Sequence, residues 1–370
     1  MQKIFNKFYN EFNNFVKSSN LETKTINKFI YQSIYQKILS IKYSYETRYI
    51  ESDDNTPYRW TKSVFRKSFA EMDGKGAYLP LIKSKKTFFI CSFDYVLCIS
   101  NKPRVSAELS YGKLNMFKKE KFKYDKKKII KNSIIFCHIS SYSPWHFYSE
   151  ILSLTNYILD KNICRNKKIY LPENKIFEQI IKIIDKDERI QFYKCNQIIY
   201  AENCLFLEGT VGELLLTNSM KLLTKKIHKK IGISNIKHNE IYIARGDKTR
   251  NRRKMLNEKL AVKTIAKKYP KLKVIKPGYL SIISTIKLVQ NSKKIFSALG
   301  TQLVLNSLFS KNLKLFHEIV PYDYYGFTTG QLVAKFLKTK YARSYSKTKK
   351  IGYSIYNDQI IDIPDLKKKL

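Results

Sequence analysis

From residue 133 onward, short apolar runs alternate with amphipathic stretches of helical period. The apolar runs predict buried strands over 133–139, 168–171, 190–193, 241–244, 273–275, 294–296 and 313–319. Between them, apolar residues recurring every three or four positions predict helices, among them 144–160, 175–184 and 302–310. Strands that alternate with helices in this way are typical of parallel sheets covered by helices. The pattern therefore predicts an α/β fold.

The first 132 residues have a different texture. Phe5, Phe8, Phe12 and Phe15 follow a helical spacing with lysines between them, which predicts a helical extension over residues 1–45. Such a helix could lie on an anionic membrane or cap the protein's own fold, and the second interpretation is favoured. Residues 78–99 carry short β-rich runs. The basic stretch 117–131 is interpreted as a solvated loop.

Two α/β blocks are expected, joined by a connection near residues 220–238. The predicted domains are a helical extension over 1–45, an acceptor-side α/β domain over 46–225, a Rossmann-like domain over 226–345 and a tail over 346–370. The predicted fold class is thus α/β, with two Rossmann-like domains that face a cleft.

The charge balance is extreme, with 70 Lys and Arg against 30 Asp and Glu, for a formal net charge of +40. This excess is consistent with an anionic partner, either nucleic acid or a membrane surface. It is equally consistent with the composition of an AT-rich genome, because Lys, Asn, Ile, Tyr and Phe are abundant together. Arginine is the better residue for bidentate phosphate recognition, so the arginines carry more weight than the lysines.

The 370-residue chain contains no window of about 18 uncharged apolar residues, and its first residues lack the apolar core of a secretory signal. We expect a cytosolic protein, with peripheral attachment to the inner face of the membrane as an option. Its six cysteines show no metal-ligand spacing and several lie in apolar runs, which indicates structural thiols. Asp185 and Asp187 form a D-x-D of the kind that holds a nucleotide-sugar cation, but they lie in a polar turn, and no metal site is predicted.

The first candidate site is the segment SPWHFYSE, residues 143–150. Ser143 suits a helix N-cap and Pro144 suits the first helical position. His146 and Glu150 are four residues apart and therefore share one helix face, at a strand-to-helix junction where α/β sheets bind ligands. Glu150 could act as a general base. The alternative is that His146 only caps the helix and Glu150 is a surface acid.

The second candidate is RGDKTRNRRK, residues 245–254, in which six of ten residues are basic, directly after a strand. Four arginines and a glycine in this position indicate phosphate binding, whereas a solvated charged face is the alternative. The third candidate is the strand-to-helix turn at Gly300, Thr301 and Gln302, which could present amides to an anion. It matches neither a dinucleotide fingerprint nor a P-loop.

These three segments, in this order, resemble the motifs of the family-61 glycosyltransferases, the capsular-polysaccharide biosynthesis group. The resemblance covers residues 78–320 loosely and rests on an HF-x-x-E helix, an Arg-rich segment with an N-E pair, and a Gly-containing loop before an N-x-x-F helix and a strand ending in Glu. The matching residues are His146, Phe147, Glu150, Arg245, Arg252, Arg253, Asn257, Glu258, Gly300, Thr301, Asn306, Phe309 and Glu318.

The resemblance implies a GT-B-like enzyme that moves a sugar from a nucleotide sugar to a glycan acceptor, which could be lipid-linked, without an obligatory metal or other cofactor. Arg245, Arg252, Arg253 and the amides near Gly300 would bind the diphosphate, and Glu318 would bind ribose hydroxyls. Glu150 would be the base of an inverting transfer, with His146 orienting it or sharing the role.

Many family members carry a His in the Gly-containing loop, where this chain has Leu299 and Val304 around Gly300. A catalytically inactive scaffold of the same fold is therefore one alternative. A nucleic-acid-binding protein is the other, although the sequence contains no recognisable nucleic-acid-binding motif and no nucleic-acid partner is expected.

Overall fold

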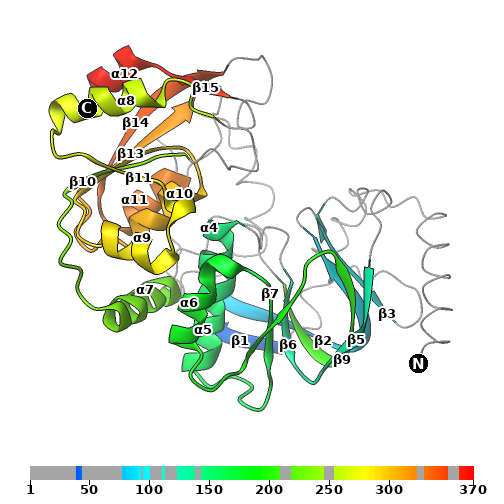
Figure 1. The fold of residues 1–370 in the computed structure, drawn as a ribbon. Helices are drawn as coiled ribbons and strands as arrows, with labels where there is room; N and C mark the ends of the chain where they lie inside the picture. The colour runs from blue at the N-terminus through cyan, green and yellow to red at the C-terminus, as the bar shows by residue number, and fades with distance from the viewer. Residues whose placement is uncertain are drawn as a thin grey trace. The chain divides into compact units, whose positions relative to one another are not determined.

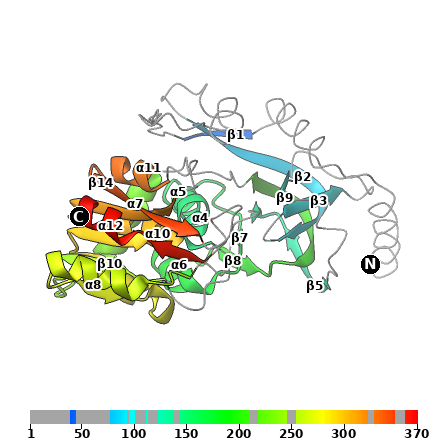
Figure 2. The same ribbon diagram turned by 90° about the horizontal axis from the view of Figure 1, so that it is seen from above.

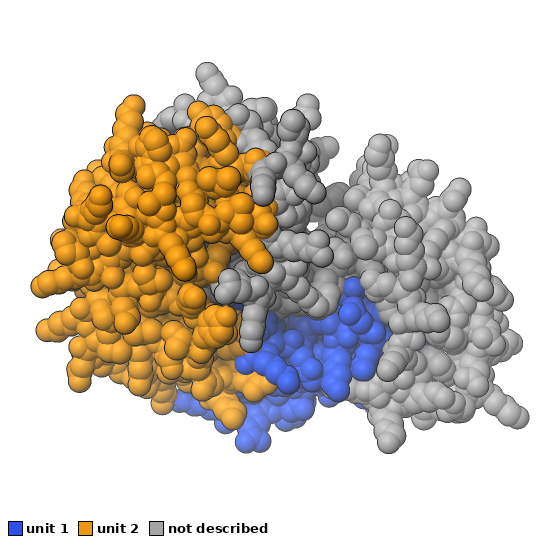
Figure 3. Space-filling model, turned by 45° about the horizontal axis from the view of Figure 1, so that its top comes forward, with its two compact units in different colours: residues 1–46, 71–175, 184–215 blue, residues 47–70, 176–183, 216–370 orange. Residues whose placement is uncertain are grey.

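The computed structural model describes residues 39–43, 77–92, 95–100, 111–112, 123–137, 143–208, 218–245, 254–322, 329–348 and 358–370 (Figure 1). These residues form a mixed α/β structure with two sheets. The chain divides into two compact units, residues 1–46, 71–175 and 184–215, and residues 47–70, 176–183 and 216–370 (Figure 3).

The sheet of the first unit is half antiparallel and half parallel. Its order is β4(Tyr111–Gly112)-β3(Tyr95–Ser100)-β2(Ala77–Cys91)-β9(Gln197–Glu208)-β6(Ile134–Cys137)-β7(Ile169–Pro172)-β8(Ile190–Tyr193), with β1(Leu39–Tyr43) on β2 and β5(Lys123–Lys131) on β9. β9 connects the two halves of the sheet, because it runs antiparallel to β2 and parallel to β6. The β-rich runs expected over residues 78–99 thus form the antiparallel half of the sheet, and the strands predicted from the alternating pattern form the parallel half.

Three predictions for this unit need correction. Residues 39–43, predicted as the end of a helix, form β1 along β2, while residues 1–38 of the predicted extension lie outside the described part of the chain. The predicted loop 117–131 contains β5, because Ile130 is fully buried against β9 despite the lysines before it. β9 was not predicted, since Glu202 and Asn203 interrupt its apolar pattern.

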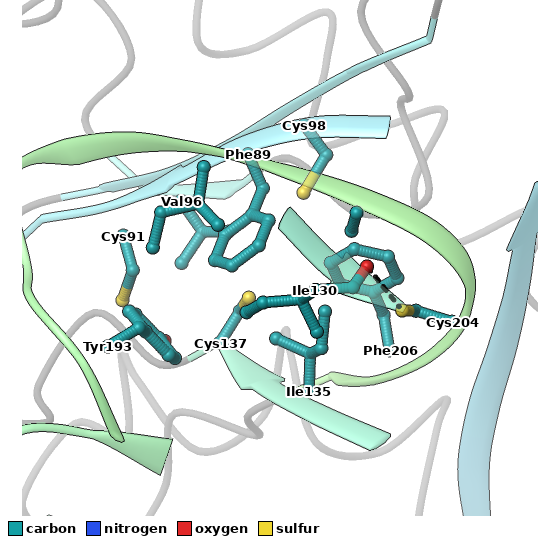
Figure 4. Packing of buried hydrophobic residues seen from close by; sticks show 12 residues of the cluster. Phe89, Cys91, Val96, Cys98, Ile130, Ile135, Cys137, Tyr193, Cys204 and Phe206 are labelled. Atoms are coloured by element: carbon teal, nitrogen blue, oxygen red, sulfur yellow. Dashed lines mark hydrogen bonds between the residues drawn. The ribbon is translucent and has the colours of Figure 1, made fainter. Parts of the chain in front are cut away.

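The interior of the first unit encloses most of the cysteines. Figure 4 shows Cys91, Cys98, Cys137 and Cys204 among the side chains of one hydrophobic cluster, with the Cys204 thiol 3.5 Å from the carbonyl oxygen of Ile130. None of the six cysteines forms a disulfide, and burial raises the pKa of the Cys137 and Cys204 thiols above their ordinary value. The buried cysteines of this cluster pack as small apolar side chains, as predicted.

The predicted helix 144–160 is confirmed as one continuous helical segment with three parts. It starts as α4(Pro144–His146), widens to a π-helix over η3(Phe147–Leu152) and ends as α5(Ser153–Asp160). Ser143 occupies the N-cap position with extended backbone, but its hydroxyl makes no capping hydrogen bond. Single-turn π-helical stretches within helices often mark functional sites. The 3-10 turn η4(Lys175–Phe177) and α6(Glu178–Ile184) follow β7.

The sheet of the second unit has the order β11(Lys273–Ile275)-β10(Glu240–Ile243)-β12(Lys294–Ala298)-β13(Leu315–Pro321)-β14(Lys340–Thr348)-β15(Gln359–Ile361). Neighbouring strands are parallel up to β14, and β15 is antiparallel. The connections include α8(Glu258–Lys268), the 3-10 turn η5(Pro277–Tyr279), α9(Ile282–Val289), α10(Thr301–Leu308) and α11(Thr329–Phe336). Numbered along the chain, the five parallel strands thus lie across the sheet in the order 2-1-3-4-5, which is typical of doubly wound folds.

Two stretches that were interpreted as connection and tail belong to this unit. Residues 218–231, at the predicted domain connection, form α7(Asn218–Ile231), which buries Met220, Leu223 and Ile227 along one face. Residues 358–370 of the predicted tail form β15 and α12(Ile363–Lys369), where Asp362 caps the helix. The alternation of buried Gln359 and Ile361 with exposed Ile360 explains why so short a segment pairs with β14. In the described part of the chain, no helix is long and apolar enough to cross a membrane.

The second unit buries His317 in its sheet, and this predicts a pH-dependent stability. Burial lowers the pKa of His317 to about 4, because the interior disfavours the charged imidazolium. The unfolded chain therefore binds the proton first, so the free energy of unfolding should be constant above about pH 6.5 and fall as the pH drops toward 4. Near pH 5 the loss attributable to this residue should be about 1.4 kcal/mol per pH unit.

Urea denaturation at several pH values measures this dependence. The variant His317→Gln should make the curve between pH 6.5 and 4 less steep, with the contribution of His228 remaining, whereas His238→Gln, at a partly exposed position, should change it less. His228, whose pKa burial also lowers to about 4, offers a second variant should His317→Gln fail to fold. An unchanged slope in both buried-site variants would contradict the assignment.

Candidate functional site

The strand order of the second unit places two sequence-predicted segments side by side. β10 and β12 are neighbours, but the chain leaves β10 toward β11 on one side and leaves β12 toward β13 on the other. A crevice for ligands forms in doubly wound sheets where the order reverses in this way, outside the carboxyl ends of the strands. Arg245 follows β10 and Gly300 follows β12, so both lie at this reversal point.

The Arg245 guanidinium lies against the backbone of Gly300. A Cβ atom at residue 300 would be 3.0 Å from Nη2 of Arg245, 3.8 Å from Cζ and 3.9 Å from Nε. The φ of Gly300 is 163°, an extended value that any residue adopts, so a side chain here would crowd the guanidinium and would not strain the backbone. The partly exposed cation thus lies at the start of α10, where the helix macrodipole also favours an anion.

Glu258 fixes the backbone from which Arg245 projects. Its Oε1 accepts hydrogen bonds from the backbone N–H of Arg245 and from the hydroxyl of Tyr242, both at 3.1 Å. Burial raises the pKa of Glu258, and the hydrogen bond from Arg245 partly opposes this shift. The hydroxyl of Ser297 donates to the carbonyl of Ile243 at 2.7 Å, which ties β12 to β10 just before the site.

Both polar atoms of the Asn257 side-chain amide form hydrogen bonds with Ile361 of β15. Its Nδ2 donates to the carbonyl of Ile361 at 2.9 Å, and its Oδ1 accepts from the N–H of Ile361 at 2.8 Å. The N-E pair therefore holds the end of the Arg-rich segment in place from two sides. Arg252 and Arg253 lie outside the described residues, as do the side chains of Thr301 and Gln302, whose backbone forms the first turn of α10. Their predicted roles stay predictions.

Glu318 is fully buried in β13, away from solvent. Its Oε2 accepts from the hydroxyl of Tyr341 at 2.8 Å, and that hydroxyl accepts from Nε of Arg343 at 2.9 Å. Burial, together with the nearby Glu318 carboxylate, raises the pKa of Tyr341, so the phenol remains a donor. Gly330, in the first turn of α11, packs directly on the carboxylate. Glu318 therefore binds within the fold, and we do not assign ribose recognition to it.

In the first unit, His146 and Glu150 form a close pair on the α4–η3 segment. Nδ1 of His146 lies 2.7 Å from Oε1 of Glu150. The Glu150 side chain is 1% exposed and that of His146 is 22% exposed. If Glu150 is ionised, its carboxylate only accepts, so Nδ1 would carry the proton of this hydrogen bond and Nε2 would be the basic nitrogen. The pair has the geometry of a histidine oriented by a buried acid.

Asp185, the first acid of the D-x-D segment, has a structural role. The two oxygens of Asp185 accept from the backbone N–H groups of Arg189 at 2.9 Å and Ile190 at 2.7 Å, which closes the turn before β8. Within the described residues, no group of three or more His, Cys, Asp and Glu side chains could hold a metal ion.

Tyr242, Tyr341 and Arg343 are part of these networks but were not predicted from the sequence. Tyr341 and Arg343 are two apart on a strand and so share a face, which is a weak signal on its own. Their significance follows only from the register of β13 and β14, which places Glu318 opposite Arg343. No sequence spacing reveals that register.

Comparison with known families gives one informative match. Residues 144–314 match the family model described as Glycosyltransferase 61. The matched region contains His146 and Glu150 as well as Arg245, Glu258 and Gly300, and it ends before Glu318. No curated protein matches the chain.

The packing of Gly330 on Glu318 predicts that a single methyl group is destabilising. In Gly330→Ala, the new Cβ would overlap Oε2 of Glu318 and lie 2.7 Å from its Cδ, inside a fully buried site. We expect the free energy of unfolding to fall by about 1–3 kcal/mol, the usual cost of overpacking.

Gly278→Ala is the matched control, because a Cβ at Gly278 meets no atom within 4 Å. It should change stability by less than about 0.5 kcal/mol. Denaturant unfolding of the two variants beside the wild type measures both values, and equal stabilities would show that the close approach at Gly330 is absent in solution.

Proposed function

We propose that this chain, which belongs to glycosyltransferase family 61 through residues 144–314, transfers a sugar from a nucleotide sugar to a glycan acceptor of a surface polysaccharide. The glycosyltransferase activity follows from the family, and the donor class, the acceptor and the mechanism are our proposals. The observation that supports them most directly is the Arg245 guanidinium over Gly300 at the carboxyl ends of β10 and β12, inside the matched region.

Arg245 would bind the diphosphate of the donor. A guanidinium can donate two parallel hydrogen bonds to phosphate oxygens, and the first N–H groups of α10 point toward the same edge of the sheet. As the bond from the anomeric carbon to the diphosphate breaks, negative charge accumulates on the leaving oxygen. A fixed cation at that position stabilises the transition state more than the ground state. Arg252 and Arg253 are proposed to add charge to the same site.

We propose that this transfer needs no metal ion, since Arg245 can supply the positive charge that a divalent cation provides in other glycosyltransferases. Donor turnover should then continue in the presence of EDTA.

The base is proposed to be His146, with Glu150 as its positioning residue. The Glu150 side chain is enclosed and bonded to Nδ1, whereas His146 is partly exposed. Nε2 would take the proton of the acceptor hydroxyl while its oxygen attacks the anomeric carbon and the diphosphate leaves from the opposite face, so the configuration inverts. The buried carboxylate stabilises the imidazolium that forms. The sequence analysis expected Glu150 to be the base and His146 to orient it or share the role, so this proposal exchanges the two roles.

The base on the α4–η3 segment also bears on the alternative of an inactive scaffold. The His that many relatives carry in the Gly-containing loop is absent here, but an oriented imidazole is present at His146. We therefore propose an active enzyme. A GT-B-like arrangement of two facing domains is part of this proposal, because the base and the leaving-group site must meet one pair of substrates.

Removing the Arg245 side chain should abolish most donor turnover. We expect Arg245→Ala to lower kcat/KM by roughly 100- to 1,000-fold, the usual effect of deleting one group that stabilises developing charge. Hydrolysis of a panel of UDP-, GDP- and CMP-sugars measures it. The exposed Arg165 provides the control, since Arg165→Ala makes the same change in net charge and should leave turnover close to wild type. Equal rates in all three proteins would refute the diphosphate site.

The two residues of the His146–Glu150 pair should differ in the size of their effect. We expect His146→Ala to lower kcat by about 100-fold or more, as for loss of a general base, and added imidazole to restore part of it. Glu150→Gln should lower kcat less and respond less to imidazole, because the histidine remains. The control Glu178→Gln alters an exposed acid and should be neutral. If Glu150→Gln is the more damaging change and imidazole rescues neither variant, Glu150 is the base.

A further inference from the structure

One surface of the second unit combines exposed aliphatic side chains with exposed lysines. Leu256, Leu260 and Ile360 are 47%, 50% and 42% exposed, and backbone pairing brings the segments that carry Leu256 and Ile360 together. Exposed lysines of α8 and α12 flank them. We call this surface the lysine–aliphatic face; it consists of Leu256, Leu260, Ile360, Lys259, Lys263, Lys267, Lys367, Lys368 and Lys369.

Backbone hydrogen bonds between segments 100 residues apart build the face. The N–H of Gln359 donates to the carbonyl of Lys254, and the N–H of Leu256 donates to the carbonyl of Gln359, both at 2.8 Å. With this pairing, the side chains of Met255, Gln359 and Ile361 are buried. The alternate residues Leu256 and Ile360 are left on the outside. The two Asn257–Ile361 hydrogen bonds fix the register. The aliphatic side chains are thus held outward by the fold.

The lysines of α8 extend the face away from these residues. Lys263 and Lys267 follow Leu260 at three- and seven-residue spacing, so all three lie along one side of the helix, opposite the buried Ala261 and Ile265. α12 contacts α8, and its final lysines are exposed to solvent next to it (Figures 1 and 2).

The acids near the face accept hydrogen bonds from backbone N–H groups. Asp358 accepts from the N–H of Lys254, Asp362 from the N–H of Asp365, and Asp365 from the N–H of Tyr345, at 2.9, 3.0 and 2.9 Å. Their carboxylates are therefore engaged by backbone groups, while the lysine ammonium groups of the face are exposed to solvent. The six lysines outnumber these three acids, so the net charge of this surface is positive.

We propose that the lysine–aliphatic face docks on an anionic lipid bilayer. Aliphatic side chains can enter the interface between headgroups and acyl chains, while surrounding lysines attract anionic headgroups. A nucleic-acid surface would instead favour arginines for phosphates and aromatic rings for base stacking, and this face offers lysines and aliphatic chains. The face begins at the edge of the sheet where Glu258 holds Arg245, so docking would place the donor site near lipid. The docking itself does not depend on the proposed transfer activity.

Sedimentation of the full chain with phosphatidylcholine vesicles, with and without 30 mol% phosphatidylglycerol, tests the proposal. We expect binding to the anionic vesicles only, and weaker binding at higher salt. The double variant Lys263→Glu, Lys267→Glu should lower the partition coefficient by about tenfold or more. Leu260→Ser with Ile360→Ser should also weaken binding, with unchanged net charge.

The matched control is Lys225→Glu, Lys229→Glu on α7, which changes two exposed lysines and the net charge by the same amount elsewhere in the unit. It should reduce binding clearly less. Equal losses in the two charge variants would overturn the proposal in favour of a diffuse effect of net charge. No vesicle binding, or α8-dependent binding to duplex DNA in its place, would overturn it as well. Thermal melting confirms that each variant folds, and Lys263→Gln, Lys267→Gln replaces the charge variant if it does not.

Discussion

The contact between the Arg245 guanidinium and the backbone of Gly300 is the feature on which the rest of the second unit's site depends. It combines two adjacent parallel strands whose connections leave in opposite directions, a glycine at the second strand end, and a fixed backbone at the first. A Cβ at residue 300 would press on the tip of the guanidinium and shift it from this position. An arginine is thereby held at the carboxyl edge of the sheet, where a helix N-terminus adds its own positive field.

Much of the fold was predictable because the second unit is regular. Strands 273–275 and 190–193 were predicted with the bounds that the structure has, and every predicted strand of the second α/β block is present. The errors lie where tertiary pairing overrides local pattern. β5 is rich in lysine and β9 contains a polar interruption, yet both are strands because each completes the other's backbone hydrogen bonds. α7 looks like a polar connection, since its lysines outnumber its buried residues.

In the candidate site, too, residues placed by local pattern were predictable from the sequence and residues placed by long-range pairing were not. Arg245 and Gly300 were found because each follows a strand, and strand-to-helix turns at one sheet edge converge by topology. Asn257 and Glu318 were assigned to ligand binding, but their partners are Ile361, Tyr341 and Gly330, which the sequence gives no reason to place beside them. Contacts set by strand register or by a segment 100 residues away cannot be derived from spacing along the chain.

Three acidic residues of the motifs share one physical behaviour. Glu150, Glu258 and Glu318 are each shielded from solvent, and each accepts from a group whose position matters: an imidazole, the N–H of Arg245, or a tyrosine hydroxyl. A buried carboxylate without such a donor would be costly, whereas one with a donor fixes that donor strongly. These acids therefore orient an imidazole, the backbone of an arginine and a phenol. The sequence analysis assigned Glu150 to catalysis and Glu258 and Glu318 to the nucleotide sugar, whereas in the fold each of the three carboxylates holds a neighbouring group of the protein in place.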